Sequence, residues 1–429
     1  MPAPSPAPPP APTAAERALP RVRGHIEALD GIRALAALMV LVFHVAIESG
    51  AALAPGVGGA LLSSGELGVP LFFALSGLLL YRPWARAALD GTPGPAVRPY
   101  LWRRALRVLP AYWVVAVVAL LLWSREHLDS VRAWVEVLTL TFTYNRDPWW
   151  VGTGPYGLGQ MWSLCVEASF YVLLPVFAAV LARLAARGGG DVDARARRLL
   201  AGLAALSVVG AAALIPQFYP DPRVYLHAWL PRTLGMFAVG MALAVVSEWA
   251  WRERGPDGPV RRFCRTLPRA AGLCWALAGI VYLLASTPAA GPRFVGVDGV
   301  WISLVNLLTS MGFAFFVIAP VALMPARTDA AGGGARVAAL LAHPVVRFLG
   351  RVSYGIFLWQ FVVLYLWRDF TGQEIFTGSF WLDVVPVAAG TVLLAAATHR
   401  WIEEPSRRWY GGMDRRRRRR RELRERDRV

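Results

Sequence analysis

Long apolar runs alternate with short polar segments along almost the whole chain. Ten runs approach the roughly 20 apolar residues that a membrane-spanning helix needs. They lie near residues 29–47, 67–81, 108–123, 162–184, 199–215, 229–249, 271–286, 301–324, 352–367 and 382–401. An eleventh apolar segment, 131–143, is short and holds Glu136, so it predicts an interfacial or re-entrant helix. The pattern predicts an all-α, polytopic membrane bundle of about ten transmembrane helices.

The composition supports a membrane protein and excludes an ordinary soluble domain. Of the 429 residues, 56% are hydrophobic and only 17% are charged, whereas soluble domains carry about 25% charged residues. The longest predicted loop, 124–161, is too short to form a soluble catalytic domain. Any chemistry is therefore expected within the membrane region or at its two faces.

The distribution of charge predicts an orientation. All 45 basic residues are arginine, and the net charge of +17 could suggest nucleic-acid binding. However, 37 arginines, counting Arg400 at the end of the last run, fall on one side of the ten predicted spans, and only 6 fall in the opposite loops. Because cytoplasmic loops retain positive charge, we expect both termini in the cytoplasm and no nucleic-acid partner. Counting 131–143 as a full span would destroy this alternation.

The two ends differ from the membrane region. Residues 1–25 are rich in Pro and Ala and predict a disordered cytoplasmic tail, and residues 26–408 form the predicted membrane domain. Residues 409–429 form an Arg-rich cytoplasmic tail, which is expected to bind anionic lipid headgroups. Cys165, Cys264 and Cys274 lack the spacing of metal ligands, so no metal is expected.

Ionisable side chains inside predicted spans are candidates for function, because burying charge in a bilayer is costly. Four stand out: Arg33, His44, Glu167 and Arg232. Arg33 and His44 are eleven residues apart, so on a helix they share one face, with about 16.5 Å between them along the axis. The structural alternative is that Arg33 extends to a lipid phosphate and His44 bonds a carbonyl group.

Several short motifs follow one another in a fixed order along the chain. They are Asp-Gly-Ile-Arg at 30–33 with His44, Leu-Phe-Phe-Ala-Leu-Ser-Gly at 71–77, Arg-Arg-Ala-Leu-Arg at 103–107, Trp-Ser-Leu-Cys-Val-Glu at 162–167, Tyr-Gly-Ile-Phe-Leu-Trp at 354–359 and Ile-Glu-Glu-Pro at 402–405. In this order the chain resembles the membrane-bound acyltransferase-3 family of integral-membrane O-acyltransferases. The resemblance extends from about residue 26 to residue 408.

The resemblance implies particular site residues. The family's Arg, ten residues and His in the first span correspond to Arg33 and His44. Its Arg-x-x-Arg corresponds to Arg104 and Arg107, and its Trp-Ser-x-x-x-Glu corresponds to Trp162, Ser163 and Glu167. The chain departs from the family at Gln360, where many members have His, so a second catalytic His is not expected there.

These matches lead to expected roles. Arg33, Arg104 and Arg107 are expected to bind the phosphates of the donor acyl-CoA, acetyl-CoA above all. Four more arginines are expected to help, namely Arg82, Arg86, Arg98 and Arg103. The alternative explanation is that these arginines only keep their loop on the cytoplasmic side. His44 and Glu167 are the expected catalytic residues, with His44 acting as a base or as an acyl carrier.

Other roles stay open at the level of sequence. Glu167 could orient His44 or bind the acceptor, or it could pair with Arg232 for folding only. Trp162, Ser163 and Tyr354 are expected to bind substrate. Ser76 has no basic partner in the sequence and is not interpreted as a nucleophile.

The resulting hypothesis is an O-acyltransferase of the cell membrane that moves an acetyl or other short acyl group from cytoplasmic acyl-CoA to a hydroxyl. The acceptor would be a cell-envelope carbohydrate, or a glycosylated or macrolide-type metabolite. The alternatives are a proton-coupled secondary transporter or polysaccharide exporter, and a structural scaffold. No internal repeat supports a transporter, and a scaffold does not explain the buried charges.

Overall fold

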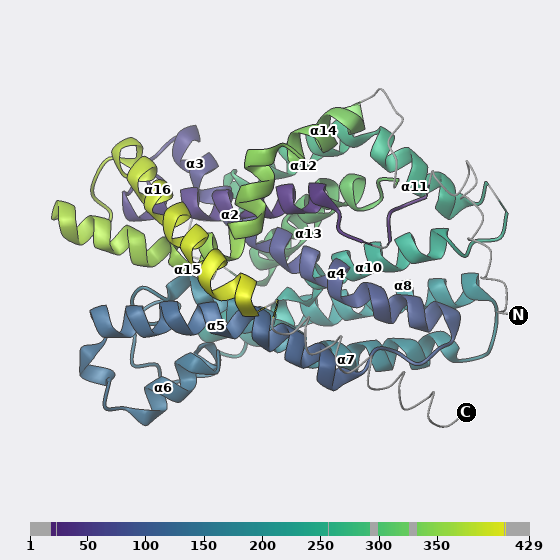
Figure 1. The fold of residues 1–429 in the computed structure, drawn as a ribbon, viewed down its shortest axis with the longest axis horizontal. Helices are drawn as coiled ribbons and strands as arrows, with labels where there is room; N and C mark the ends of the chain where they lie inside the picture. The colour runs from purple at the N-terminus through teal and green to yellow at the C-terminus, as the bar shows by residue number, and fades with distance from the viewer. Residues whose placement is uncertain are drawn as a thin grey trace, which may run out of the picture.

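The chain is described by a computed structural model, which covers residues 19–22, 24–255, 257–291, 299–325, 333–406 and 408. Regular structure within these residues is helical, apart from an isolated bridge between Pro20 and Pro325. Most helices run roughly along the long axis of the molecule (Figure 1). Most of the predicted N-terminal tail, residues 1–18, and the Arg-rich tail, 409–429, lie outside the described residues.

Each of the ten predicted apolar runs forms a helix. The long helices are α2 (Glu27–Glu48), α4 (Gly68–Asp90), α5 (Val97–Trp123), α7 (Trp162–Ala186), α8 (Val192–Ala212), α10 (Leu230–Ala250), α12 (Ala271–Ala285), α13 (Val300–Ala322), α15 (Pro344–Thr371) and α16 (Phe380–Thr398). The short ones are α3 (Val57–Ser63), α6 (Val131–Leu138), α9 (Ile215–Phe218), α11 (Pro259–Arg269) and α14 (Gly333–Leu341). Within the described residues, nine helical segments are long and apolar enough to cross a bilayer. The chain is a polytopic helical membrane protein.

The seventh predicted span is the irregular one. Helix α12 has 15 residues, which is about 22 Å of helix against a hydrocarbon core of about 30 Å. It meets the Arg-rich helix α11 at a bend of 74°. The count reaches ten crossings only if α11 and α12 together form one span.

Helix α6 agrees with the prediction that segment 131–143 does not cross the membrane. It has eight residues, which is about 12 Å of helix. Ser130 caps its first turn by accepting a hydrogen bond from the backbone N–H of Ala133 at 3.2 Å. Its position relative to the bilayer surface stays a prediction.

Several helices extend beyond the apolar runs, because the residues that favour a helix start or end lie outside those runs. Helix α15 begins with Pro344 in its first turn and ends before Gly372, which has a φ of 66°. Helix α4 likewise ends before Gly91, with a φ of 68°. Proline favours the first helical turn, and glycine adopts the left-handed conformation that ends a helix. Both helices therefore carry their polar ends past the apolar core.

Close contact between α4 and α10 depends on two glycines. A methyl group placed on Gly240 would overlap the carbonyl oxygen of Ala74, and one on Gly77 would overlap that of Phe237. Small residues allow membrane helices to approach at backbone distance. This contact fixes the position of Ser76, which directly precedes Gly77 on α4.

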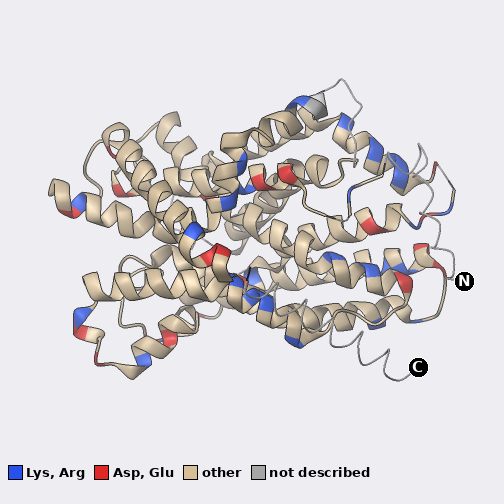
Figure 2. Ribbon diagram, viewed as in Figure 1, with Lys and Arg blue, Asp and Glu red and all other residues tan. Residues whose placement is uncertain are grey.

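Ionic contacts join α4 to the far end of α10. Glu248, only 1% exposed, accepts hydrogen bonds from Arg86 at 2.7 Å and from Arg252 at 2.8 Å. Arg252 also pairs with Asp90 at 2.5 Å. Basic residues gather around α8, α11 and the middle of the molecule and are sparse at the end where α6 lies (Figure 2). The arginine asymmetry is thus also visible in three dimensions.

Candidate active site

A cavity of about 210 Å³ lies where α2, α4, α5, α7 and α15 meet. We call it the central cavity. Its polar lining consists of Arg33, Ser76, Arg104, Arg107, Ser163, Glu167, Tyr171, Ser353 and Tyr354. Six of the eight residues predicted for the site line it, namely Arg33, Arg104, Arg107, Ser163, Glu167 and Tyr354. The other three polar lining residues, Ser76, Tyr171 and Ser353, all carry hydroxyl groups. The arrangement therefore unites motifs that are far apart in the chain.

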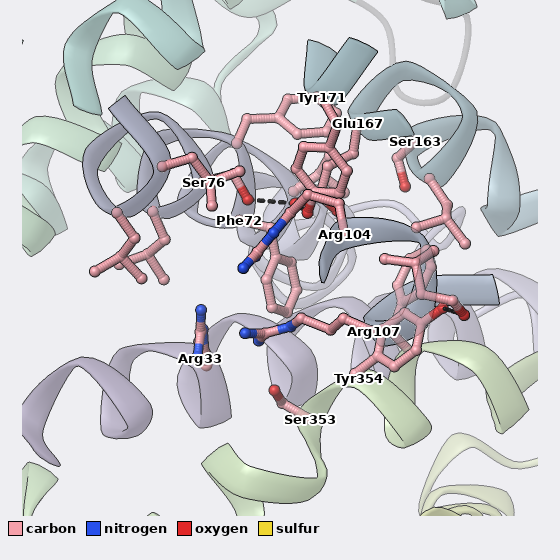
Figure 3. A pocket seen from close by; sticks show the side chains of 18 residues that line it. Arg33, Phe72, Ser76, Arg104, Arg107, Ser163, Glu167, Tyr171, Ser353 and Tyr354 are labelled. Atoms are coloured by element: carbon pink, nitrogen blue, oxygen red, sulfur yellow. Dashed lines mark hydrogen bonds between the residues drawn. The ribbon is translucent and has the colours of Figure 1, made fainter. Parts of the chain in front are cut away.

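Three guanidinium groups converge on the central cavity. Figure 3 shows Arg33 from α2 and Arg104 and Arg107 from α5 pointing toward one another. Nη1 of Arg33 lies 3.7 Å from the carboxylate oxygen Oδ1 of Asp30. Within the described part of the chain, Arg104 and Arg107 form no ion pair, and the buried Nε of Arg104 has no hydrogen-bond partner. Three guanidinium groups facing one space outnumber its single lining carboxylate, Glu167, and favour an anionic ligand.

The single acidic group among the described lining residues, Glu167, is already engaged. Its Oε1 accepts hydrogen bonds from the hydroxyl of Ser76 and, at 2.6 Å, from the hydroxyl of Tyr171. Among the described residues, no hydrogen bond or ion pair joins Glu167 to His44 or to Arg232, the two partners considered from the sequence. Sequence reasoning missed Ser76, because nothing in the pattern of α4 indicates that it faces α7.

His44 does not line the central cavity. Its Nδ1 lies 3.1 Å from Oε1 of Gln360, whose amide Nε2 donates to the carbonyl oxygen of Phe357 at 3.0 Å. Because Nε2 of Gln360 donates to Phe357, the amide oxygen of Gln360 is the atom that faces the His44 ring. His44 must then carry its proton on Nδ1 and keep the lone pair on Nε2. Gln360, which is 1% exposed, is thus placed to fix the tautomer of His44.

An aromatic wall separates His44 from the central cavity. Phe72 and Phe357 both line the cavity, and their ring centroids are 6.4 Å apart. Phe361, one turn farther along α15, packs against His44 with a centroid distance of 4.4 Å. His44 therefore lies about one helical turn beyond the wall, on the same helix as Arg33.

The three residues predicted to bind substrate do not form one site. Ser163 is buried at the central cavity and donates to the carbonyl of Gln160 at 3.1 Å. Tyr354 also lines this cavity, with its hydroxyl donating to the carbonyl of Val108 at 2.8 Å. Trp162 instead lines a second cavity, together with Arg232. Adjacent residues of α7 face different cavities because they are about 100° apart around the helix.

The predicted cluster of donor-binding arginines is also divided. Arg104 and Arg107 line the central cavity, whereas Arg86 is paired with Glu248. Arg98 is exposed at the start of α5, and Arg82 is buried outside the cavity lining. Among the described residues, no group of three or more His, Cys, Asp or Glu side chains could hold a metal ion.

The chain matches a known protein family over most of its length. A family model described as "Acyltransferase domain" matches residues 26–400. The peptidoglycan O-acetyltransferase OatA of Listeria monocytogenes serovar 1/2a (strain ATCC BAA-679 / EGD-e) is 24% identical over 399 residues, which are 90% of this chain and 56% of the relative.

A second relative is the Bacillus subtilis (strain 168) protein named "Putative peptidoglycan O-acetyltransferase YrhL", which is 26% identical over 398 residues. That match covers 89% of this chain and 55% of the relative. The chain thus spans little more than half the length of these relatives. No solved structure matches it significantly.

Proposed function

Because this chain belongs to the membrane-bound acyltransferase-3 family, we propose that it is an O-acyltransferase of the cell membrane. In this proposal it moves an acetyl or other short acyl group from cytoplasmic acyl-CoA to a hydroxyl of a cell-envelope carbohydrate. The observation that carries the proposal is the convergence of Arg33, Arg104 and Arg107 on one cavity.

The chemistry of the donor fits that convergence. Acyl-CoA carries several phosphate oxygens on a nucleotide, followed by a long uncharged arm that ends in the thioester. Guanidinium groups bind phosphates through charge-assisted hydrogen bonds, and Arg104 and Arg107 have no ion-pair partner among the described residues. Fixed positive charge with unused donors favours an anionic donor over a neutral one.

The arm of the donor would lead toward His44. Arg33 and His44 are about 16.5 Å apart along α2, and Phe72 with Phe357 forms the apolar wall between them. Passing an uncharged arm between aromatic side chains avoids the much larger cost of burying a charge there. The nucleotide would then stay at the arginines while the thioester reaches the ring.

The proposed step is acyl transfer assisted by His44. Nε2 of His44 takes the proton of the acceptor hydroxyl as its oxygen attacks the thioester carbonyl. The C–S bond breaks, a C–O ester bond forms, and the CoA thiolate recovers a proton from the imidazolium. Hydrogen bonding of Nδ1 to Gln360 keeps the lone pair on Nε2. An acyl-His44 intermediate is the second form of this proposal.

Two arguments support the proposed acceptor: the printed names of the relatives and the predicted orientation of the chain in the membrane. The names of the relatives refer to peptidoglycan, a hydroxyl-rich glycan outside the membrane. With both termini in the cytoplasm, as the arginine distribution predicts, acyl-CoA would enter from inside and the glycan from outside. A glycosylated or macrolide-type metabolite is the second candidate acceptor.

The test is a mass comparison. Envelope glycans and metabolites from cells with and without the gene are compared by mass spectrometry, and the purified protein is assayed for CoA release from acetyl-CoA. The proposal expects one class of glycan to gain the mass of one acyl group, and CoA release that depends on adding this glycan. Identical glycan and metabolite profiles together with no CoA release would contradict it.

A further inference from the structure

A second cavity, of about 690 Å³, lies between α4, α10, α12 and α13. We propose that it binds the acceptor as an uncharged, hydroxyl-rich saccharide. Six of its lining residues are proposed to contact the saccharide, namely Glu66, Trp162, His227, Arg232, Asn306 and Ser310. This inference rests on the proposed function and assigns the acceptor a place distinct from that of the donor.

The size and charge of the second cavity differ from those of the central cavity. Its volume is within the roughly 300–1,000 Å³ typical of small-molecule sites, and it is more than three times that of the central cavity. Glu66 and Arg232 bring opposite charges to it, and its other polar groups are largely hydroxyls. The central cavity suits an anion, whereas this one suits a neutral polar molecule.

Polar groups at the second cavity have hydrogen-bonding capacity to spare. Arg232 donates from Nη1 to Nε2 of His227 at 3.1 Å, but its buried Nε has no partner. Glu66 is classed as exposed and lines the same cavity. A saccharide offers hydroxyls that both donate and accept, which matches a carboxylate and a guanidinium in one space.

Trp162 supplies the apolar part of the proposed site. Its half-buried indole ring lines the cavity, and the ring of His227 lies 6.0 Å away. Flat aromatic rings present a broad apolar face, on which the C–H face of a sugar ring can pack. Polar groups around one aromatic face form a suitable surface for a molecule that is apolar on its faces and polar at its edges.

The second cavity adjoins the proposed reaction centre. Val69 and Phe73 line both cavities, so these two apolar side chains lie at the boundary between them. Gly65 packs against Phe43, the residue before His44, and a methyl group on Gly65 would lie 2.8 Å from Cβ of Phe43. Because Ser64 and Glu66 flank Gly65 and line the cavity, the cavity lies at the level of His44 along α2. A bound acceptor would therefore approach the thioester from this side.

Protection of single cysteines tests the proposal directly. Ser310→Cys places a thiol in the second cavity, and Ser353→Cys places one in the central cavity. Both changes replace one atom, and the native cysteines are buried. The purified variants are labelled with a small methanethiosulfonate reagent, alone, with N,N′-diacetylchitobiose, or with coenzyme A.

The disaccharide should slow labelling at position 310 about fourfold when present at about three times its Kd, because only the unoccupied fraction reacts. It should leave position 353 unchanged, whereas coenzyme A should slow position 353 and not 310. Adding Trp162→Ala should remove most of the disaccharide protection at 310.

Equal labelling at 310 with and without disaccharide would overturn the acceptor site and indicate a water-filled passage. Failure of coenzyme A to protect 353 would instead count against the donor site of the proposed function. If Ser310→Cys does not fold, Ser63→Cys, in the same cavity, replaces it with the same expected result.

Discussion

At the scale of single residues, His44 carries the proposed proton transfer. Its Nδ1 is held by Gln360, so its Nε2 is the basic nitrogen. We expect His44→Ala to express and fold normally but to lose transfer by at least about 100-fold, the lower range for general acid–base catalysis. Initial rates with saturating acetyl-CoA measure this. Transfer within a few-fold of wild type would make His44 a structural residue.

Gln360 is expected to act through His44 as a positioning residue. Gln360→Leu removes the acceptor of the Nδ1 hydrogen bond, so kcat should fall on the order of tenfold, the equivalent of one lost hydrogen bond. KM for acetyl-CoA should change little, because the arginines are untouched. Gln360→Glu keeps an acceptor oxygen at the ring and should retain more activity. Equal losses in both variants would contradict the assigned role.

The donor-binding role of the arginines has a matched control on the same helix. Arg104→Ala or Arg107→Ala removes a charge-assisted phosphate contact worth about 1.5–3 kcal/mol, so the apparent KM for acyl-CoA should rise by roughly ten- to 150-fold. Arg98→Ala removes the same charge from an exposed position of α5 and should leave KM nearly unchanged. A similar rise in KM in all three variants would contradict a specific phosphate contact and indicate a general electrostatic effect.

The sequence identified individual site residues better than it identified their partners. Arg33, Arg104, Arg107 and Glu167 were predicted for the site and do meet at one cavity. The partner of Glu167, Ser76, is 91 residues away, and that of His44 is 316 residues away. Helical periodicity indicates which residues share a face, but it does not indicate which helices face each other.

At the scale of helices, the α4–α10 contact supports the site. Gly240→Ala would force a methyl group onto the backbone of α4, and overpacking of this kind costs about 1–3 kcal/mol. We expect a lower melting temperature for this variant in detergent. Gly279→Ala, on α12 with open space around it, is the control and should melt at or above the wild-type temperature. Equal melting temperatures would contradict the close contact.

Helix positions were predictable because apolar runs are long and regular, and each run became a helix. The ends were less predictable, since α15 begins at Pro344 and the apolar run begins eight residues later. The bend between α11 and α12 was not foreseen. Hydropathy measures apolar length, whereas the direction of a helix depends on its packing against neighbours.

At the scale of the whole molecule, two cavities of different charge lie next to each other. The central cavity gathers positive charge, the second cavity gathers hydroxyls with balanced charge, and Val69 with Phe73 separates them. If both termini are cytoplasmic, the donor and acceptor approach from opposite sides, and the acyl group alone crosses the membrane. A transporter or exporter would instead move the glycan itself.

The most direct measurement follows isotopically labelled acetyl groups across sealed proteoliposomes. Orientation is determined by thiol labelling at Thr92→Cys and Val151→Cys, both exposed in the loops on either side of α5. Labelled acetyl-CoA is supplied on the side of position 92, and a peptidoglycan fragment on the side of position 151. Transfer across the membrane predicts labelled O-acetyl ester on the fragment, CoA released in equal amount on the donor side, and no movement of the fragment. Passage of unmodified fragment across the membrane, or ester formation only when donor and acceptor share one side, would contradict it.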